Sequence, residues 1–308
     1  MPDSPEAHRL GPHVVGVRVV VRRVLPGETG PSGGPAMTDV LGICTAWGEG
    51  PSGEGYCVIA PETGDPVEIR LADIVSGKPV PPRPSVRHRV STRAAEQHTI
   101  NLWPRLETEP LGEWVLRHDP APVGRLRKRA SSCLAIGDPG VDLAEATDRV
   151  RTFYEARDRR VLAQVEHGSE VDDALVAAGW APVPDGDAHF LIASLARALR
   201  SARAAGTGDE PRLTEDDDHA LVELGDVAAG RATLDGDWLG LHSLTVEESH
   251  RRRGLGTTVL AALLDWGAER GATTAWLHVE VDNAPALAMY ERLGFRVHHT
   301  CRYLTPDL

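Results

Sequence analysis

Short apolar runs alternate with turn residues over the first 76 positions of the chain. Each run is rich in β-branched or aromatic side chains and is bounded by glycine, proline or serine, a pattern that predicts strands and not helices. The runs fall at residues 14–24, 39–47, 56–60 and 66–71, followed by a short turn at 71–75. Four or five such strands predict a small all-β barrel over residues 12–76.

Prolines interrupt this pattern at residues 77–84, with the sequence Gly-Lys-Pro-Val-Pro-Pro-Arg-Pro. Proline has no backbone N–H and a fixed φ, so we expect this stretch to continue neither a sheet nor a helix. The sequence therefore predicts a linker over residues 77–92.

From residue 93 onward the apolar spacing predicts alternating helices and strands, which is typical of an α/β or mixed α+β body. In the first part, helices are expected at 93–101, 143–156 and 171–178, and strands at 114–118, 126–136, 161–166 and 189–195. A polar stretch at 201–215 carries no predicted helix or strand. After it we expect strands at 220–224, 227–234 and 238–246, a helix from about Gly254, a strand at 274–281, a helix at 284–293 and a last strand at 296–303.

Two segments of the body have the same sequence pattern. Residues 174–180 and 289–295 both predict a helix that ends on glycine and is followed at once by an aromatic residue, Trp180 or Phe295. Leu175 occupies the place that Tyr290 has in the second copy. We therefore interpret residues 93–308 as one composite body with a degenerate half, 98–200, and a complete half, 209–308.

Composition and charge argue against some classes of function. The net charge of −12 argues against a general nucleic-acid binder, which needs a basic surface, and disfavours anionic membranes. It leaves a cationic amine substrate plausible. No apolar run approaches the length of a spanning helix and the first residues do not resemble a leader, so a cytoplasmic location is expected.

Metal sites and disulfides are not predicted. The cysteines at positions 44, 57, 133 and 301 are scattered without a CxxC pair, so they are expected to be reduced, buried thiols. The acidic run 215–218 before His219 is interpreted as solvated charge. We therefore expect no metal.

A phosphate site is predicted where the strand 238–246 leads through a polar turn into a glycine-bearing helix start. The pattern is Arg251-x-x-Gly254-x-Gly256. A helix amino terminus presents free N–H groups and a partial positive charge, and glycines let phosphate oxygens approach the main chain. The arrangement suits a diphosphate.

Together with this loop, residues 277–295 resemble the GNAT superfamily of N-acetyltransferases, because a strand, Asn283, a helix, Tyr290 and Gly294-Phe295 follow in the family's order. The amino-terminal strands resemble an SH3-like barrel of the kind found in bacterial proteins. The resemblance to the superfamily implies a GNAT-like mixed sheet that binds acetyl-coenzyme A and uses no metal. In the family, the last unit normally begins with a strand and helices that this sequence does not show.

The resemblance also assigns roles to the matching residues. The pyrophosphate would be held by Arg251, Arg252, Arg253, Gly254, Leu255 and Gly256, with Thr257 next to them. The pantetheine arm would pair with Leu244, Thr245 and Val246 as an added strand, and the Val246 amide would polarise the thioester carbonyl. Asn283 would touch the pantetheine, cap the following helix, or both.

The resemblance makes Tyr290 the acid that protonates the departing thiolate; the alternative is a tyrosine packed in the core. Strand alternation places His278 and Glu280 on one face, expected to line a cleft. His278 is one candidate base, although relatives that acetylate ribosomal-protein termini have glutamate there. Glu280, His242 or no side-chain base remain alternatives.

The sequence thus predicts an N-acetyltransferase in which an amine attacks the thioester directly within a ternary complex. No residue with an activating partner in the sequence suggests an acyl-enzyme, Cys301 included. The acceptor can be a small molecule, a protein amino terminus or a lysine. Two alternatives stay open: a non-catalytic acetyl-coenzyme A sensor or scaffold, and an adaptor whose barrel binds a protein partner.

Overall fold

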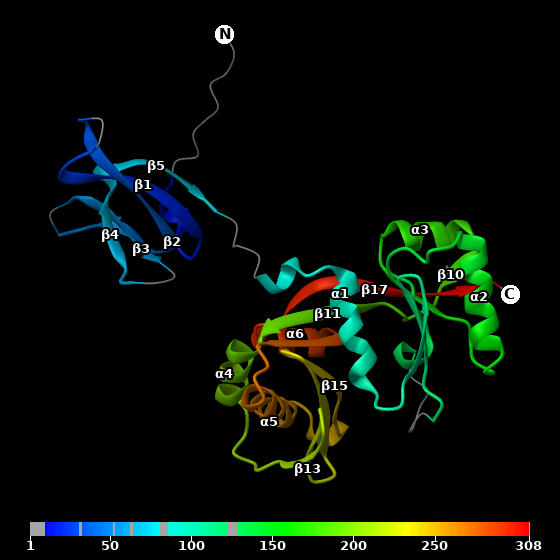
Figure 1. The fold of residues 1–308 in the computed structure, drawn as a ribbon. Coiled ribbons are helices and arrows are strands. Elements are labelled where there is room, and N and C mark those ends of the chain that lie inside the picture. Colours follow the sequence, from blue (N-terminus) through cyan, green and yellow to red (C-terminus); the bar gives the residue numbers. More distant parts are fainter. Residues whose placement is uncertain are drawn as a thin grey trace. The chain divides into compact units, whose positions relative to one another are not determined.

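A computed structural model describes residues 10–30, 33–51, 53–61, 64–80, 86–121 and 128–307. The chain divides into two compact units, Met1–Pro84 and Ser85–Leu308 (Figure 1). Among the described residues, no helix combines the length and the apolar character needed to cross a membrane. Each unit is described below by itself.

The amino-terminal unit is a five-stranded antiparallel sheet in the order β4-β3-β2-β1-β5. Alternate residues of its strands turn inward, and Val19, Val21, Cys44, Cys57 and Ile59 form its buried core. The small β domain expected from the sequence is present, while the likeness to SH3-like barrels stays a prediction. Its elements are η1 (Pro12–Val14), β1 (Arg18–Thr29), β2 (Pro35–Glu49), β3 (Gly55–Pro61), β4 (Val67–Arg70), η2 (Leu71–Asp73) and β5 (Ile74–Pro79).

The expectation that residues 77–84 cannot continue a sheet is wrong for its first three residues. β5 runs through Gly77 and Lys78 to Pro79, which pair with Val21, Val20 and Val19 of β1. β5 is an edge strand, and proline is tolerated at the end of such a strand because its missing donor need not pair. Of the rest of this stretch, residues 81–85 lie outside the described residues.

The second unit is built on one mixed sheet whose strands follow the order β12-β13-β14-β15-β16-β11-β17-β9-β8-β7-β6, with β10 paired to β17. Its fold is the mixed α/β fold that the sequence predicted. The strands are β6 (Glu107–Leu111), β7 (Trp114–His118), β8 (Cys133–Leu134), β9 (Ala163–Glu166), β10 (Trp180–Pro182), β11 (Ala188–Ser194), β12 (Arg212–Asp216), β13 (His219–Leu224), β14 (Ala228–Asp235), β15 (Trp238–Val246), β16 (Thr274–Glu280) and β17 (Arg296–Pro306).

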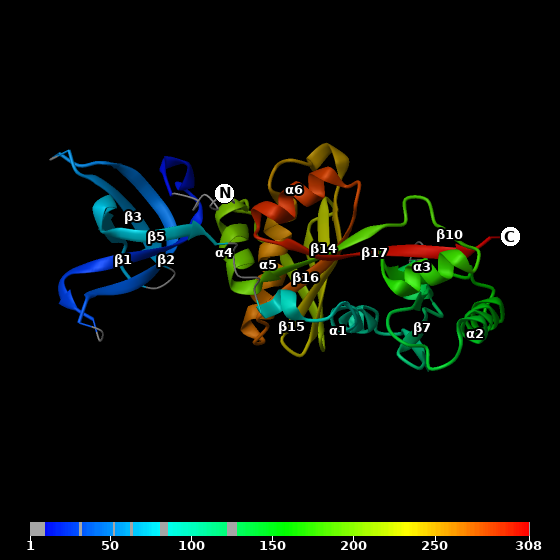
Figure 2. The same ribbon diagram turned by 90° about the horizontal axis from the view of Figure 1, so that it is seen from above.

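Helices cover this sheet, and short 3-10 turns join some of the elements. They are η3 (Val86–Arg89), α1 (Thr92–Gln97), η4 (His98–Leu102), η5 (Arg129–Ser131), α2 (Leu143–Glu155), α3 (Glu170–Ala177), α4 (Leu195–Ala205), η6 (Glu248–His250), α5 (Leu255–Glu269) and α6 (Ala284–Arg292). α4 and α5 pack side by side at one end of the sheet, whereas α2 and α3 lie at the other end (Figures 1 and 2).

The two halves of the body exchange strands. β11 follows β10 in the first half but pairs with β16 of the second half, from Ala188↔Glu280 to Ser194↔Thr274. Conversely, β17 begins in the second half and its far end pairs with β9 and β10 of the first. β17 can be followed in Figures 1 and 2 from the α6 side to the α3 side. Neither half therefore completes its sheet alone.

Two predicted segments are corrected by the structure. The expected strand 126–136 is the turn η5 followed by the two-residue β8, with residues 126 and 127 outside the described range. The polar stretch 201–215 contains the end of α4 and the edge strand β12. α4 was missed because half of its buried face is alanine and arginines share the same turns. Its buried residues nevertheless have helical spacing: Leu195, Ala198, Leu199 and Ala202.

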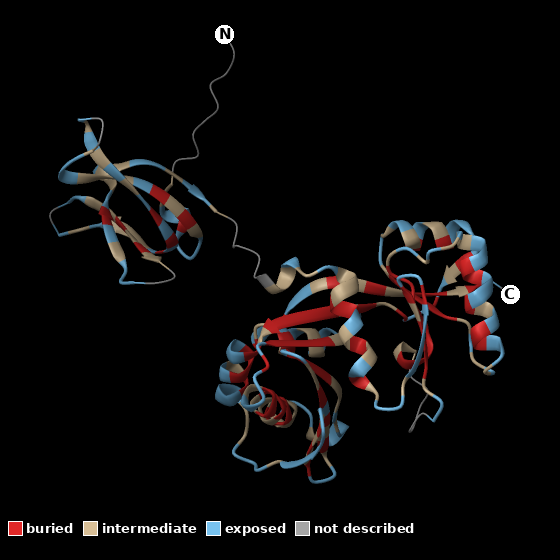
Figure 3. Cartoon of the chain, in the orientation of Figure 1, coloured by how far each residue is buried: buried red, intermediate tan, exposed pale blue. Residues whose placement is uncertain are grey.

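The two faces of the sheet near β15 and β16 are occupied differently. Leu239, Leu241, Leu277 and Val279 are buried with α5 in the largest core cluster. Residues of the opposite face pack toward α1 and η4, among them Trp238 and Trp276. Burial is densest along β11, β16 and the inner side of α5 (Figure 3).

We predict that Gly42→Ala destabilises the amino-terminal unit by roughly 1–3 kcal/mol, the cost typical of forcing atoms into a packed interior. A Cβ at Gly42 would lie 2.2 Å from the carbonyl oxygen of Ala60, a backbone atom that cannot rotate away. Hydrogen–deuterium exchange should accelerate in peptides covering residues 35–61. Gly48→Ala is the matched control on the same strand, because its Cβ would meet nothing within 4 Å; equal effects of both variants would contradict the prediction.

Candidate active site

The sheet opens between two neighbouring parallel strands, both wholly within the described residues. β15 and β16 pair from Trp238↔Thr274 to Leu241↔Leu277, and their paired register ends there. Farther along, β15 remains paired with β14 and β16 remains paired with β11. The strands therefore separate after Leu241 and Leu277, and residues 242–246 present one backbone edge to the opening.

A bulge shapes that edge. Arg231 pairs with His242 and Ala229 pairs with Thr245, so two residues of β15 stand opposite Gly230 alone. One of them, Ser243, has φ +55°, the left-handed conformation that a bulge accommodates. Farther on, Glu247 N donates to the carbonyl oxygen of Val227, the residue before β14. Successive amides of an extended strand point to opposite edges, so the Val246 N–H is directed into the opening.

The start of α5 lies at the end of this edge. Its N-cap is Gly254, with φ +87°, and the following Leu255-Gly256-Thr257 carries no acidic side chain. The other long helix that follows a parallel strand is α2, and it starts differently. Its N-cap Asp142 accepts a hydrogen bond from Glu145 N, and Glu145 places a second carboxylate in the first turn. Of these two helix starts, only that of α5 leaves its N–H groups to an external anion.

The predicted loop residues surround this helix start. Arg251, Arg252 and Arg253 are exposed, whereas Gly254, Leu255, Gly256 and Thr257 are half-buried. Arg251 Nε donates to Val246 O at 3.2 Å, which ties the loop to the end of β15. The structure thus brings the candidate pyrophosphate loop next to the candidate pantetheine strand Leu244-Thr245-Val246.

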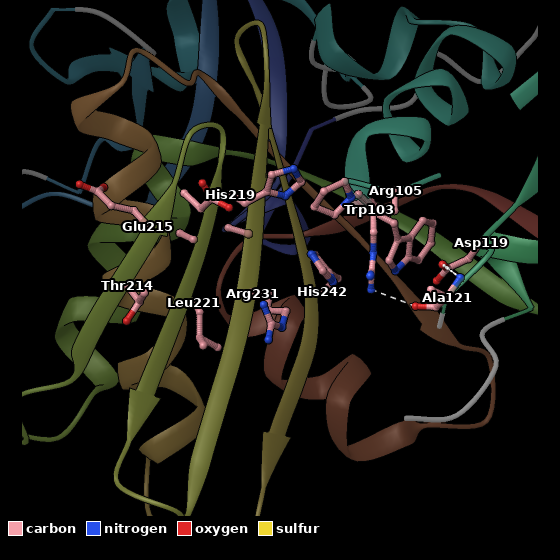
Figure 4. Close-up of a pocket in the computed structure, with 15 residues that line it drawn as sticks. Trp103, Arg105, Asp119, Ala121, Thr214, Glu215, His219, Leu221, Arg231 and His242 are labelled. Atoms are coloured by element: carbon pink, nitrogen blue, oxygen red, sulfur yellow. Dashed lines mark hydrogen bonds between the residues drawn. The ribbon is translucent and has the colours of Figure 1, made fainter. Parts of the chain in front are cut away.

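A pocket of ≈ 350 Å³ lies on the face of the sheet that packs toward η4 (Figure 4). Trp238 and Gly240 face η4, since His98 stacks on Trp238 and a Cβ at Gly240 would touch Leu102 and Trp276. His242 follows in the same alternation and lines the pocket. The wall from the strands includes Thr214, Glu215, Asp216, His219, Leu221, Arg231 and His242, and the facing wall includes Leu102, Trp103, Pro104, Arg105, Asp119 and Ala121.

Tyr290 lies on the opposite face, in the core that α5 and α6 form on the sheet. It is buried, and its ring makes an edge contact with Phe295. Burial, with a smaller contribution from the nearby Glu280 carboxylate, raises the pKa of the Tyr290 phenol, which is therefore protonated at neutral pH. Glu280 is exposed at the end of β16. Asn283 caps α6 by accepting from Ala286 N at 3.3 Å, as the sequence predicted for one of its two possible roles.

His278 does not line an open cleft with Glu280, so that expectation is wrong. Its side chain is 1% exposed, and Nε2 is 2.7 Å from Glu96 Oε1. The alternation of β16 was predicted correctly, but α1 covers this face and its Glu96 is also fully buried. Period-two alternation identifies a shared face and carries no information about what a distant helix places over it.

Glu96 is the centre of a buried polar cluster that sequence reasoning missed. Its Oε1 accepts from His278 Nε2, from His299 Nε2 at 3.0 Å and from Cys301 Sγ at 3.0 Å. Its Oε2 accepts from Gln164 Nε2 at 2.9 Å, and the buried Arg117 guanidinium donates to Gln164 Oε1 at 2.8 Å. These residues lie on α1, β7, β9, β16 and β17, so no local spacing in the sequence connects them.

The cluster sets the protonation of its members. Burial acting alone would raise the pKa of the Glu96 carboxyl, but its histidine partners outweigh burial and hold that pKa well below its ordinary value. Burial, and then the charge of Arg129, lower the pKa of His278 to about 4. Donor atoms of Glu96, His278 and Cys301 lie within 4.8 Å of one another. We interpret the group as a hydrogen-bonded cluster, because Glu96 Oε1 already accepts from His278, His299 and Cys301. The expectation of no metal stays a prediction.

Comparisons with known proteins agree with this geometry. The family model for the C-terminal domain of the probable histone acetyltransferase Rv0428c matches residues 181–304. The probable histone acetyltransferase Rv0428c of Mycobacterium tuberculosis is 28% identical over 309 aligned positions, covering 94% of this chain and 95% of that protein. The mycothiol acetyltransferase of Clavibacter sepedonicus is 35% identical over 242 positions, covering 64% of this chain and 77% of the relative.

Two further matches concern the second half and the fold. The ribosomal protein bS18-alanine N-acetyltransferase of Salmonella typhimurium is 39% identical over 84 positions, covering 27% of this chain and 52% of that protein. The solved structure of a GCN5-related N-acetyltransferase from Kribbella flavida superposes with a TM-score of 0.52 at 20% identity, covering 71% of this chain and 96% of that one. The second match supports the fold.

We predict that the free energy of unfolding falls as the pH drops from about 6.5 to about 4, with His278 contributing at most about 3 kcal/mol. In the unfolded chain His278 has a pKa of about 6.5. In the folded protein its pKa is about 4, so the buried imidazole binds a proton only at lower pH. Over that window the unfolded state holds more protons, so acid favours it. Urea unfolding measured across this pH range tests the slope.

His278→Gln should flatten that slope, because the amide does not titrate and can still donate to Glu96. His167→Gln, at an exposed histidine, is the control. A His278→Gln protein with the unchanged wild-type slope would show that His278 is not the residue responsible.

Proposed function

Since this chain belongs to the GNAT superfamily of N-acetyltransferases, we propose that it moves the acetyl group of acetyl-coenzyme A directly onto an amine bound in the pocket beside His242. The observation that carries the proposal is the opening between β15 and β16 after Leu241 and Leu277. Beyond these residues β15 and β16 are not paired with each other, so backbone groups of β15 are left for a bound ligand. A thioester held there is accessible to a nucleophile from one face while its sulfur points to the other.

The cofactor would lie along β15 and end at α5. The N–H groups of the first turn of α5 face the diphosphate, and the exposed Arg251, Arg252 and Arg253 add positive charge around it. Leu244 and Val246 offer their free strand edge to the amides of the pantetheine arm. The Val246 N–H donates to the thioester oxygen, whose negative charge grows as the amine attacks.

The acceptor would occupy the pocket on the η4 face. Asp119 and Asp216 supply carboxylates that suit a cationic amine, and Arg105 and Arg231 suit anionic or hydroxyl groups on the same molecule. Trp103 adds a flat apolar wall near His242, with ring centroids 6.4 Å apart. These features favour a small polar amine or the first residues of a peptide.

The chemistry forms one bond and breaks one. The amine nitrogen donates its lone pair to the thioester carbon, and the carbon–sulfur bond breaks as the tetrahedral intermediate collapses. An ammonium acceptor loses two protons overall, of which one ends on the thiolate sulfur and one leaves the site. Tyr290 lies on the sulfur side and stays protonated at neutral pH, which suits the donor of the first proton.

Release of free thiol from acetyl-coenzyme A tests the proposed function. The amine panel should contain short peptides with free α-amines, a lysine peptide with a blocked amino terminus, and glucosamine. At least one amine is expected to give turnover with stoichiometric thiol and acetylated product. Binding of acetyl-coenzyme A without turnover on every member would support the sensor alternative instead.

Tyr290→Phe is predicted to lower kcat by about 10²–10⁴ on the amine found in that panel, the range expected for loss of a general acid. The ring stays, so the packing against Phe295 and the stability should change little. Acetyl-coenzyme A affinity should also survive. Near-normal turnover under conditions in which chemistry limits the rate would leave Tyr290 as a core residue.

Gly254→Glu is predicted to abolish the rise in melting temperature that acetyl-coenzyme A causes, since it puts a carboxylate where the diphosphate would bind. Gly271→Glu is the matched control: Gly271 has φ +85°, close to the +87° of Gly254, and lies just beyond the opposite end of α5. Both variants carry the same charge and the same backbone strain. A full ligand-dependent rise in Gly254→Glu, or an equal loss in both variants, would refute the location of the phosphate site.

A further inference from the structure

The start of α5 is held by a segment from another part of the body. This segment, residues 205–209, runs from the last residue of α4 toward β12 and is called the connector. Thr207 N of the connector donates to Thr258 Oγ1 at 2.8 Å, and the two threonine hydroxyls are 3.0 Å apart. Thr258 is buried in the first turns of α5. The connector lies outside the loop and the strand to which the sequence assigns the cofactor.

The connector packs directly on the N-cap of α5. A Cβ at Gly254 would lie 3.1 Å from Thr207 Cγ2 and 3.4 Å from Ala205 O. On the connector itself, a Cβ at Gly206 would lie 3.2 Å from Thr258 Oγ1. Because glycine occupies both positions, the two backbones approach closely enough for Thr207 and Thr258 to form their hydrogen bond.

The position of the connector is fixed by α4. The buried face of α4 belongs to the same core cluster as the buried face of α5. At the surface, Arg203 Nη2 of α4 also donates to Asp265 Oδ1 of α5 at 2.6 Å. The end of α4 is therefore packed on α5 before any ligand binds, and the connector leaves α4 beside the first turn of α5.

The two threonine hydroxyls have defined hydrogen-bond directions. Asp209 Oδ2 lies 2.6 Å from Thr207 Oγ1 and, as a carboxylate oxygen, accepts the Thr207 proton. Thr207 Oγ1 is then left to accept. The Thr258 proton lies between Thr207 Oγ1 at 3.0 Å and Gly254 O at 3.3 Å, while Thr258 Oγ1 accepts from Thr207 N. Thr258 thus joins the connector to the carbonyl group of Gly254.

This link orients the peptide between Gly254 and Leu255. Gly254 O accepts from Thr258 N at 3.0 Å as well as from Thr258 Oγ1. The C=O and N–H of a trans peptide point in opposite directions, so a carbonyl held along the helix directs the Leu255 N–H out of its start. Thr258 N makes the first hydrogen bond of α5. The N–H groups before it, of Leu255, Gly256 and Thr257, are the ones available to an anion.

We propose that Thr258 is a positioning residue for the diphosphate of acetyl-coenzyme A, and that the connector holds Thr258 in place through Thr207. The proposal rests on the proposed acetyl transfer, because it concerns the cofactor site of that reaction. Thr258 itself does not touch the cofactor. It keeps the preceding N–H groups of α5 in the orientation that the diphosphate requires, so that less ordering is left for the ligand to impose.

Calorimetric titration of the full-length protein with coenzyme A tests this role without an acceptor. Thr258→Val keeps the branched side chain but loses the hydroxyl, and it should raise the Kd of coenzyme A about tenfold. Thr258→Ser keeps the hydroxyl and should bind within about twofold of the wild type. Thr147→Val is the matched control: Thr147 is buried near the start of α2, and its hydroxyl donates to Ala144 O of the same helix at 2.9 Å. Its affinity should be unchanged.

A comparison of two acetyl donors separates positioning from a general loss of structure. S-acetylpantetheine carries the thioester but lacks the diphosphate. With the amine identified by thiol release, Thr258→Val should raise KM for acetyl-coenzyme A and leave kcat at saturation unchanged. Its kcat/KM for S-acetylpantetheine should equal that of the wild type. A loosened active site would instead lower activity with both donors.

The outcomes separate this inference from the proposed function. A wild type that binds coenzyme A but acetylates no amine would defeat the proposed function and leave the binding test intact; a wild type that does not bind coenzyme A would defeat both. With a binding wild type, equal affinity in Thr258→Val, or an equal loss with both donors, would overturn the role of Thr258 alone.

A variant of the connector keeps the test available if Thr258→Val does not fold. Thr207→Val removes the hydroxyl that faces Thr258 and leaves α5 unaltered. It should raise the Kd of coenzyme A about threefold, because Thr207 N can still donate to Thr258. An unchanged Kd in Thr207→Val would show that the connector does not hold the phosphate site.

Discussion

The architecture of the body depends on the hydrogen bonds that satisfy the buried carboxylate of Glu96. A charge removed from water must be compensated by nearby donors, or it costs several kcal/mol. Glu96 finds donors on β9, β16 and β17, and the buried Arg117 of β7 balances its charge through Gln164. These strands belong to both halves, so the satisfaction of one charge fixes how the halves fit together and where α1 lies across β16.

The exchange of β11 and β17 also gives each half a partner strand on the outer side of its parallel pair of strands. β16 can leave β15 without losing its hydrogen bonds, since β11 supports it from the other side. The equivalent region of the first half is closed: Asp142 caps α2, Glu113 accepts from Asp138 N, and Trp114 Nε1 donates to Gly137 O. One fold, used twice, thus yields one accessible opening and one packed core.

What the sequence could predict follows from the range of the interactions involved. The phosphate loop and the Asn283 cap depend on residues a few positions apart, so Gly254, Gly256 and Asn283 could be recognised locally. The Glu96 cluster joins residues separated by up to 205 positions, and no spacing rule connects α1 to β17. α4 was missed because alanine and arginine dilute its apolar face, and the extension of β5 to Pro79 because an edge strand tolerates a residue that an inner strand would exclude.

His278 shows how a helix distant in sequence can change the role that a strand position suggests. Burial, and then the charge of Arg129, lower the pKa of its imidazole, so the interior favours the neutral ring. The neutral ring donates from Nε2 to Glu96, and its Nδ1 has no hydrogen-bonding partner among the described residues. A proton on Nδ1 would leave a buried N–H group unsatisfied and add a positive charge near Arg129. The packing of α1 over β16 therefore depends on the neutral form of His278.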